Sequence, residues 1–168
     1  MTMLTRRAAL AAGGAALIAP APTLPARAQA LDDTIRIGVL ADFSGPYRDT
    51  SGPTSVAAAR QAVEDLGLAA RGIKVEVIQG DHMQRADAGL ALAREWYDRR
   101  GVDMICEVNN SAVALAVAGL SREKDKAHVN TGAASAALTG EQCSSNTIHW
   151  TYDTWMFAKS SGGATVRA

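Results

Sequence analysis

The chain has 168 residues with 17 basic and 17 acidic side chains, so its formal net charge is zero. Residues 1–30 contain three arginines and no acid, which leaves 14 basic against 17 acidic side chains in the remainder. A mildly acidic remainder gives no electrostatic reason to bind nucleic acid or anionic lipid. Its length suffices for one ordinary hydrophobic core and not for two.

The first 30 residues are typical of an export signal. Arg6 and Arg7 precede an apolar run at 8–19, and a small-x-small triplet of the kind that signal peptidase reads ends at Ala30. The apolar run is too short to cross the ~30 Å bilayer core as a permanent helix, and no later stretch is long enough either. We therefore expect a signal peptide at 1–30, cleaved near Ala30. Its paired arginines resemble a twin-arginine signal, although a Sec signal with two arginines would look the same.

Strand-like and helical segments alternate through the rest of the chain. β-rich runs occupy 34–41, 73–78, 102–106 and 127–131, and apolar residues at helical spacing mark helices at 56–66, 86–97 and 111–120. A further helix that enters a strand is expected over 151–159. This alternation predicts an α/β fold, a Rossmann-like parallel sheet with flanking helices.

In open parallel sheets, ligands bind beyond the carboxyl ends of the strands. The segments expected at that edge are 42–47, 81–84, 109–111 and 132–135. They are rich in glycine and in small hydroxyl and amide side chains. The third helix is expected to begin at Ser111, where the partial positive charge of a helix N-terminus favours a ligand carboxylate. The pattern alone leaves both a ligand site and ordinary loop chemistry open.

The sequence gives little support for metal binding, acid–base catalysis or nucleotide binding. His82, His128 and His149 are too scattered for a metal site, so no metal ligation is expected. Asp81 next to His82 has no accompanying nucleophile motif, so we expect it to cap a turn at the rim of the edge. No glycine-rich nucleotide loop follows the first strand, and neither a cofactor nor enzymatic activity is expected.

Cys106 and Cys143 are the only cysteines. In an oxidising compartment they could close a loop of roughly 35 residues, worth ~3 kcal/mol in the chain-entropy model. Their separation cannot be read from the sequence, so the paired and the free state both remain open.

Several segments, taken in order, resemble one family. The opening at 35–40 followed by Ser-Gly-Pro at 44–46 is similar to the start of periplasmic leucine/isoleucine/valine-binding proteins and their amide- or urea-binding relatives. The segments at 109–116, 130–135 and 147–153 resemble the family's binding loops and the stretch that follows them. The resemblance covers residues 34–168.

The resemblance implies a type I periplasmic binding protein, which has two α/β lobes that close on a small solute. It implies the substrate-binding component of an ABC importer for an amino acid, amide or urea-like solute, with ABC permease subunits as partners of the full-length relative. Residues 31–168 would then be the N-terminal lobe in truncated form, with half of the cleft. We therefore expect the isolated chain to bind no amino acid tightly.

The resemblance also implies roles for particular residues. Ser111 would bond the ligand carboxylate, Ala133 and Ser135 would flank its amino or amide end, and Tyr47 would lie over the ligand. The expected ligand-binding residues are Tyr47, Asn109, Asn110, Ser111, Gly132, Ala133 and Ser135. Leucine-binding relatives place a threonine near Ala134, where this chain has its hydroxyl at Ser135, and this leaves the amino-group contact open.

Two other functions stay open beside the transport receptor. A periplasmic sensor or regulatory module with the same lobe would deliver a ligand signal to a partner. A small periplasmic α/β enzyme would require turnover that depends on Ser111 or Asp81.

Overall fold

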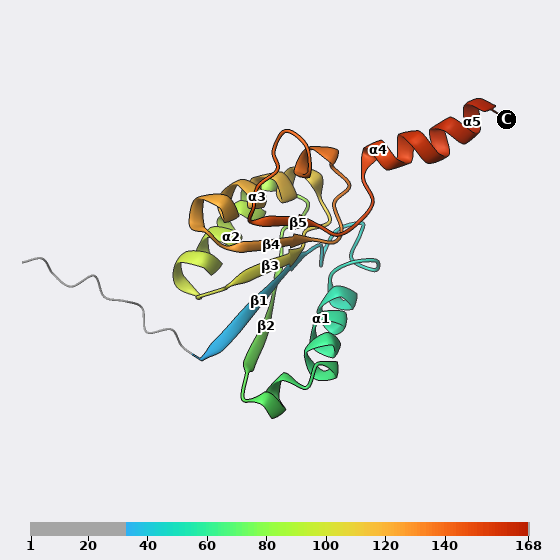
Figure 1. Ribbon diagram of the computed structural model, residues 1–168. Coiled ribbons are helices and arrows are strands. Elements are labelled where there is room, and N and C mark those ends of the chain that lie inside the picture. Colours follow the sequence, from blue (N-terminus) through green and yellow to red (C-terminus); the bar gives the residue numbers. More distant parts are fainter. Residues whose placement is uncertain (1–32, 168) are drawn as a thin grey trace, which may run out of the picture. The chain divides into compact units, whose positions relative to one another are not determined.

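A parallel sheet forms the centre of the computed structural model, which describes residues 33–167 (Figure 1). The predicted signal peptide and its cleavage site lie outside these residues. The strands are β1 (Thr34–Ala41), β2 (Lys74–Asp81), β3 (Met104–Glu107), β4 (Ala127–Asn130) and β5 (Thr147–His149). Their order across the sheet is β2-β1-β3-β4-β5, and every pairing is parallel. The predicted α/β class and the four predicted strands are confirmed.

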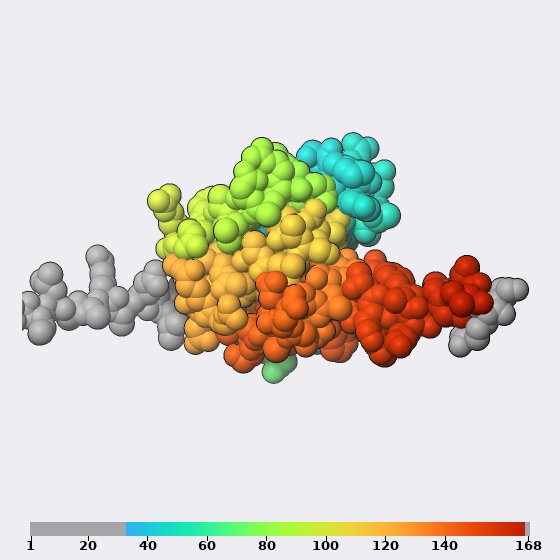
Figure 2. Space-filling view, turned by 90° about the horizontal axis from the view of Figure 1, so that it is seen from above, coloured from blue at the N-terminus to red at the C-terminus, as the bar shows by residue number. Residues whose placement is uncertain are grey.

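The long helices connect the strands, as the sequence predicts. They are α1 (Pro53–Asp65), α2 (Ala86–Arg99) and α3 (Ser111–Lys124), and short 3₁₀ turns follow at η1 (Leu68–Arg71) and η2 (Ala136–Leu138). α1 ends just before Gly67, whose φ of 57° lies in the left-handed region that glycine adopts without cost. α2 and α3 lie side by side in the space-filling view (Figure 2).

β1 is an interior strand of the sheet, because β2 and β3 pair with its two sides. Val39, Leu40 and Ala41 are fully buried. Successive side chains of a strand point to opposite faces, so Leu40 joins the core under α2 and α3 while Val39 and Ala41 face α1. This two-sided burial explains why β1 is nearly continuous in its apolar residues.

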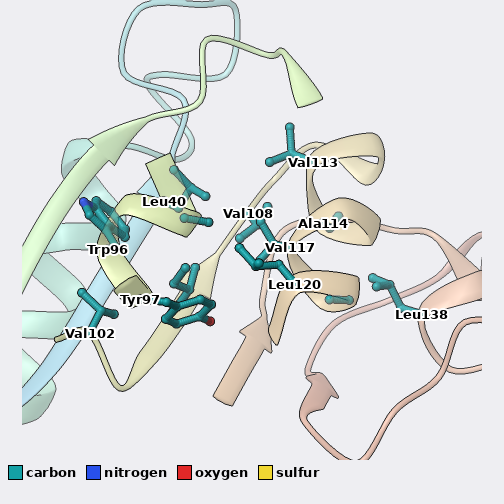
Figure 3. Close-up of a cluster of buried hydrophobic side chains, with 14 residues drawn as sticks. Leu40, Trp96, Tyr97, Val102, Val108, Val113, Ala114, Val117, Leu120 and Leu138 are labelled. Carbon is teal, nitrogen blue, oxygen red and sulfur yellow. The ribbon is translucent and has the colours of Figure 1, made fainter. Parts of the chain in front are cut away.

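The larger core lies between the sheet and the pair α2 and α3 (Figure 3). Trp96 is 1% exposed and lies directly over β1 and β2. Glycine is required beneath it, because a Cβ at Gly38 would come within 2.5 Å of the indole and one at Gly80 within 2.7 Å of it. Tyr97 is buried as predicted, and its hydroxyl lies 2.9 Å from the Ser121 hydroxyl. Burial raises the pKa of Tyr97 to about 12.

The opposite face of the sheet is covered only in part. α1 packs over β1 and β2, with Val56 buried at the contact. On this face, the strand register aligns Val39 with Cys106, Cys106 with Val129 and Val129 with Ile148. These four side chains form a row across the sheet. Exposure rises along this row, from a fully buried Val39 to an Ile148 that is 54% exposed. We call Cys106, Val129 and Ile148 the open row.

Both cysteines are free thiols. Burial, with the charge of Glu107 adding to it, raises the pKa of Cys106 to about 12, so this thiol is a poor nucleophile. Cys143 is exposed in the loop before β5.

The C-terminal part departs from the sequence prediction. β5 was not predicted, and the strand expected near Lys159 is wrong. Residues 154–167 instead continue as α4 (Thr154–Phe157), the π-helical turn η3 (Ala158–Gly162) and α5 (Gly163–Arg167). The Asp153 carboxylate caps the start of α4 by accepting a bond of 2.7 Å from the Met156 N–H. Within residues 33–167, no helix combines the length and apolarity needed to cross a bilayer.

Candidate ligand-binding site

The loops after the first four strands meet at one edge of the sheet, because the strands are parallel. The segments concerned are 42–47 after β1, 82–84 after β2, 107–111 at and after the end of β3, and 131–135 after β4. Direct hydrogen bonds join these loops to one another. The predicted convergence of the four segments is therefore present.

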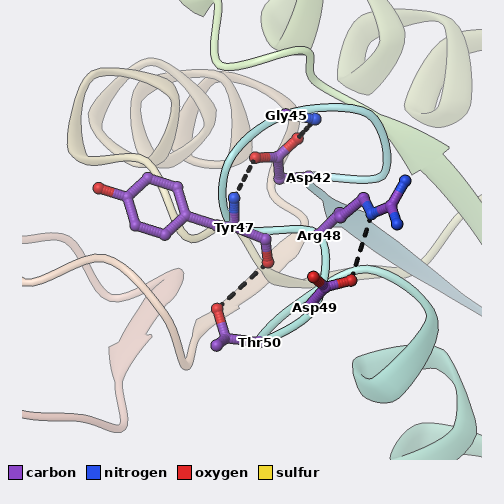
Figure 4. A network of polar contacts seen from close by, with 6 residues as sticks. All are labelled: Asp42, Gly45, Tyr47, Arg48, Asp49 and Thr50. Atoms are coloured by element: carbon purple, nitrogen blue, oxygen red, sulfur yellow. Dashed lines mark hydrogen bonds and ion pairs between the residues drawn. The ribbon is translucent and has the colours of Figure 1, made fainter.

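Asp42 organises the first loop (Figure 4). Its buried carboxylate accepts the N–H of Gly45 at 2.7 Å, the N–H of Tyr47 at 3.0 Å and the amide of Gln84 at 3.0 Å. Burial by itself would raise the pKa of Asp42, but these three donors outweigh it and lower that pKa below its usual value. The Tyr47 ring is 52% exposed and projects away from the Asp42 turn.

Asp81 caps the turn at the end of β2, as predicted. It accepts the Ser44 hydroxyl at 2.6 Å, the Met83 N–H at 2.7 Å and the Phe43 N–H at 3.3 Å. Burial would raise the pKa of Asp81, and the donors, led by Ser44, lower it overall. The carboxylate is thus committed to holding two loops together and does not form an acid–base pair with its neighbour His82.

His82 ties the end of β2 to the end of β3. It is fully buried, and its Nδ1 accepts the Gln84 N–H at 3.1 Å. The proton therefore lies on Nε2, which donates to the Asn109 Oδ1 at 2.8 Å. Asn109 keeps its Nδ2 without an intramolecular partner in the described part of the chain. Over residues 33–167, no three His, Cys, Asp or Glu side chains gather so as to hold a metal ion.

Asn110 caps α3, as its position in the sequence predicts. Its Oδ1 accepts the N–H groups of Ala112 at 3.0 Å and Val113 at 3.1 Å, and its Nδ2 donates to the Gln84 Oε1 at 2.8 Å. Two of the N–H groups at the helix terminus are therefore already occupied. Ser111 is exposed, and among the described residues its hydroxyl has no protein partner.

The segment after β4 is held by a buried side chain. Asn130 is fully buried and brackets Ala133, accepting its N–H at 3.1 Å and donating to its carbonyl at 2.7 Å. His149 Nε2 donates to the same carbonyl at 2.9 Å. Both lone pairs of the Ala133 carbonyl are thus in use, so a ligand amino group there would have to displace one of these donors. Ser135 is half-buried, and within the described residues its hydroxyl has no partner.

Glu107, which was not among the predicted site residues, also lies among these loops. Its carboxylate accepts the Ser51 hydroxyl at 3.0 Å and the Thr131 hydroxyl at 2.6 Å. Glu107 and Val108 have φ values of 77° and 56°, left-handed conformations that are uncommon for residues with a side chain. The available signal was a charged residue directly after the β-rich run at 102–106, at the carboxyl end of a strand.

Comparison with known proteins identifies the family. Residues 34–168 match the family model for periplasmic binding proteins. A periplasmic binding protein from Burkholderia mallei is 41% identical, with a TM-score of 0.77 over 80% of this chain and 36% of that one. The chain belongs to the periplasmic binding protein family. This is a family of solute-binding proteins.

Two other solved relatives agree on the fold. A branched chain amino acid ABC transporter periplasmic ligand-binding protein from Burkholderia xenovorans is 38% identical, with a TM-score of 0.74 over 79% of this chain and 36% of that one. A Rhodopseudomonas palustris solute binding protein in complex with 4-hydroxybenzoate is 24% identical, with a TM-score of 0.68 over 81% and 37% of the two chains. No curated protein matches the chain. The chain spans about a third of the length of these solved relatives.

The predicted site residues fall into two groups in this periplasmic binding protein. Asn109 and Gly132 are in direct contact, since a Cβ at Gly132 would lie 2.7 Å from the Asn109 Cα. Asn110 is linked to the Asp42 turn, and so to the backbone of Tyr47, through Gln84. In the described chain, no side-chain hydrogen bond joins Ser111, Ser135 or the Tyr47 ring to the others.

A groove lies away from this edge. An open groove of about 450 Å³ is lined by Val63, Leu68, Ile73 and Val75, among others, where α1 and η1 meet the start of β2. It lies at the amino end of β2, away from the carboxyl ends of the strands. Its lining is mainly apolar, with few polar groups that would orient a solute.

Proposed function

We propose that residues 31–168 form the N-terminal lobe of the periplasmic solute-binding component of an ABC importer. The solute is a branched-chain amino acid, an amide or a similar small polar molecule. One observation carries the proposal: the start of α3, the Asp42 turn and the segment after β4 are joined by hydrogen bonds and close contacts at one edge of a parallel sheet.

The start of α3 is suited to a carboxylate. A helix N-terminus carries about half a positive charge, and Ser111 adds an exposed hydroxyl. Because Asn110 already occupies the N–H groups of Ala112 and Val113, the ligand would bond the hydroxyl and N–H of Ser111. Asn109 Nδ2, the Ser135 hydroxyl and the Tyr47 ring would complete the contacts from this lobe.

An aromatic acid is a second candidate solute. Trp150 and Tyr152 follow the carboxyl end of β5 and are 77% and 46% exposed. Together with the exposed Tyr47, they offer flat surfaces on which an aromatic ring could stack. The relative from Rhodopseudomonas palustris was solved in complex with 4-hydroxybenzoate, which fits this chemistry.

Ligand-observed saturation-transfer NMR tests the proposal, since it detects the weak binding expected from one wall of a cleft. The isolated chain should bind leucine or 4-hydroxybenzoate, and Ser111→Ala should weaken that binding about tenfold by removing a bond to a charged group. Ser145→Ala, in the loop before β5, should change nothing. Binding that Ser111→Ala leaves untouched would contradict the assigned carboxylate position.

Export is tested separately. The full chain, expressed in a Gram-negative host, should be recovered from the periplasm with its N-terminus at Leu31. Replacing Arg6 and Arg7 with lysines should block export if the twin-arginine route is used and should leave Sec export intact. A chain that stays in the cytoplasm with Met1 retained would contradict the signal peptide.

A further inference from the structure

Glu107 is a carboxylate at the ligand edge, and in the described part of the chain no cation pairs with it. None of the ion pairs among residues 33–167 involves Glu107, Asp42 or Asp81. A partly buried carboxylate is stabilised by an opposite charge or by donors that saturate its oxygens. The three carboxylates therefore give this edge a negative potential, and they differ in how completely their oxygens are used.

Asp42 and Asp81 have more of their acceptor positions occupied by the protein than Glu107 has. Each aspartate accepts three bonds from neighbouring loops. Glu107 accepts only the hydroxyls of Ser51 and Thr131, although an ionised carboxylate has about four acceptor positions. Thr131 is exposed and Glu107 is half-buried, so the carboxylate lies near the surface of this edge.

Glu107 is also adjacent to predicted ligand-binding residues. A Cβ at Gly132 would lie 2.9 Å from the Glu107 Oε1 and 2.7 Å from the Asn109 Cβ. The exposed terminus of α3 begins four positions along the chain, at Ser111. The edge thus presents a negative group beside Gly132 and a positive helix terminus at Ser111, which is the complement of a molecule that carries both charges.

We propose that Glu107 determines solute specificity by binding the ammonium group of a zwitterionic ligand whose carboxylate lies at Ser111. This inference rests on the proposed function and narrows it to amine-bearing solutes. The unused acceptor positions of Glu107 take the ammonium N–H groups. An acid without an amine leaves Glu107 unpaired and faces its negative charge.

A matched pair of probes isolates the amine. Leucine and 4-methylpentanoate share the carboxylate and the branched chain and differ only in the α-ammonium group. By saturation-transfer NMR, the wild-type chain should prefer leucine by about tenfold or more, the effect of one charge-assisted bond. Glu107→Gln should reduce the preference to near unity, mainly by weakening leucine. Glu64→Gln on α1, which changes the net charge equally, should leave the preference intact.

The possible results separate the two proposals. If neither leucine, 4-methylpentanoate nor 4-hydroxybenzoate binds, the proposed function fails and the inference falls with it. If 4-methylpentanoate binds the wild-type chain as well as leucine does, the inference alone is overturned, whether or not Glu107→Gln folds. A Glu107→Gln chain that weakens both acids equally would show that Glu107 only ties Ser51 to Thr131, and this too overturns it.

Discussion

Gly132 allows the segment after β4 to approach the end of β3. Alanine there would place its Cβ 2.7 Å from the Asn109 Cα and 2.9 Å from the Glu107 Oε1, and the first of these is backbone that cannot swing away. The closeness of these two segments therefore depends on the absence of a side chain at one position.

Gly132→Ala should lower the free energy of unfolding by about 1–3 kcal/mol, because the backbone must shift to relieve the overlap. Urea unfolding followed by circular dichroism measures this. The matched control is Gly119→Ala on α3, where nothing lies within 4 Å and alanine should stabilise the helix by up to about 1 kcal/mol. Equal effects of the two substitutions would contradict the close packing at Gly132.

His128 is a buried group with an unmet hydrogen bond. It is fully buried, and its Nε2 has no partner among the described residues. Burial, with a smaller contribution from His149, lowers the pKa of His128 to about 4. The folded state therefore keeps this imidazole neutral under conditions in which the unfolded chain, with an ordinary histidine pKa near 6.5, takes up a proton.

Between about pH 6.5 and 4 the unfolded state binds more protons at His128, so falling pH favours unfolding. Each unit of pH in that window should cost about 1.4 kcal/mol of unfolding free energy. His128→Leu should lack this component, and the comparison of the two chains by urea unfolding at pH 7, 5.5 and 4.5 removes the contribution of the carboxylates. Parallel pH profiles would show that His128 is not buried neutral.

The sequence predicted the local structure around some candidate site residues and not around others. Asn110 and Ser111 were predictable, because capping is a local interaction that spans three residues. The Ala133 carbonyl accepts hydrogen bonds from Asn130 and from His149, which lies 16 positions away. These bonds were not predictable, because they depend on the tertiary fold. Glu107 was missed because its bonds to Ser51 and Thr131 join segments far apart in the sequence, and its left-handed backbone is uncommon for a residue with a side chain.

Among the elements, α3 contributes both to the core and to the site. Val113, Val117 and Leu120 face the sheet, while its first turn faces the ligand edge. Because Asn110 both caps the helix and bonds Gln84, the orientation of this turn is coupled to the Asp42 loop.

Asn110→Ala should lower the free energy of unfolding by about 1–2 kcal/mol, since it leaves two helix N–H groups uncapped. Asp153→Ala removes the equivalent cap from α4, a four-residue helix with exposed side chains, and should change global stability by less than about 0.5 kcal/mol. Chemical denaturation of both variants provides the comparison. A larger effect at Asp153 would mean that α4 belongs to the cooperative core.

The helices and strands with long apolar patterns were predicted from the sequence, and β5 was not. β5 has only three residues, Thr147–His149, and exists through its pairing with β4, which a local pattern does not reveal. The helix expected from Thr151 begins at Thr154, but the strand after it was wrong because Lys159–Gly162 has no alternating apolar residues.

At the scale of the whole molecule, the sheet is covered unequally. α2 and α3 bury one face, whereas the open row of Cys106, Val129 and Ile148 has partial cover on the other. Exposed apolar side chains on a sheet face favour association with other apolar surfaces.

The isolated chain should therefore bind a hydrophobic dye and self-associate as its concentration rises. Ile148→Thr should reduce both effects while keeping the β propensity of the strand, as sedimentation velocity and dye fluorescence would show. Arg60→Thr, on the exposed side of α1, serves as the control. Unchanged association in Ile148→Thr would place the apolar contact elsewhere.

The central claim is that the carboxyl edge of this sheet is one wall of a solute-binding cleft. Backbone amide NMR of the isolated chain, titrated with leucine, tests it most directly. The account predicts shifts concentrated at 107–113 and 131–135 and around Tyr47, with none along η1 and the start of β2. Saturable shifts confined to the groove at Val63, Leu68 and Ile73, with the carboxyl edge unchanged, would contradict it.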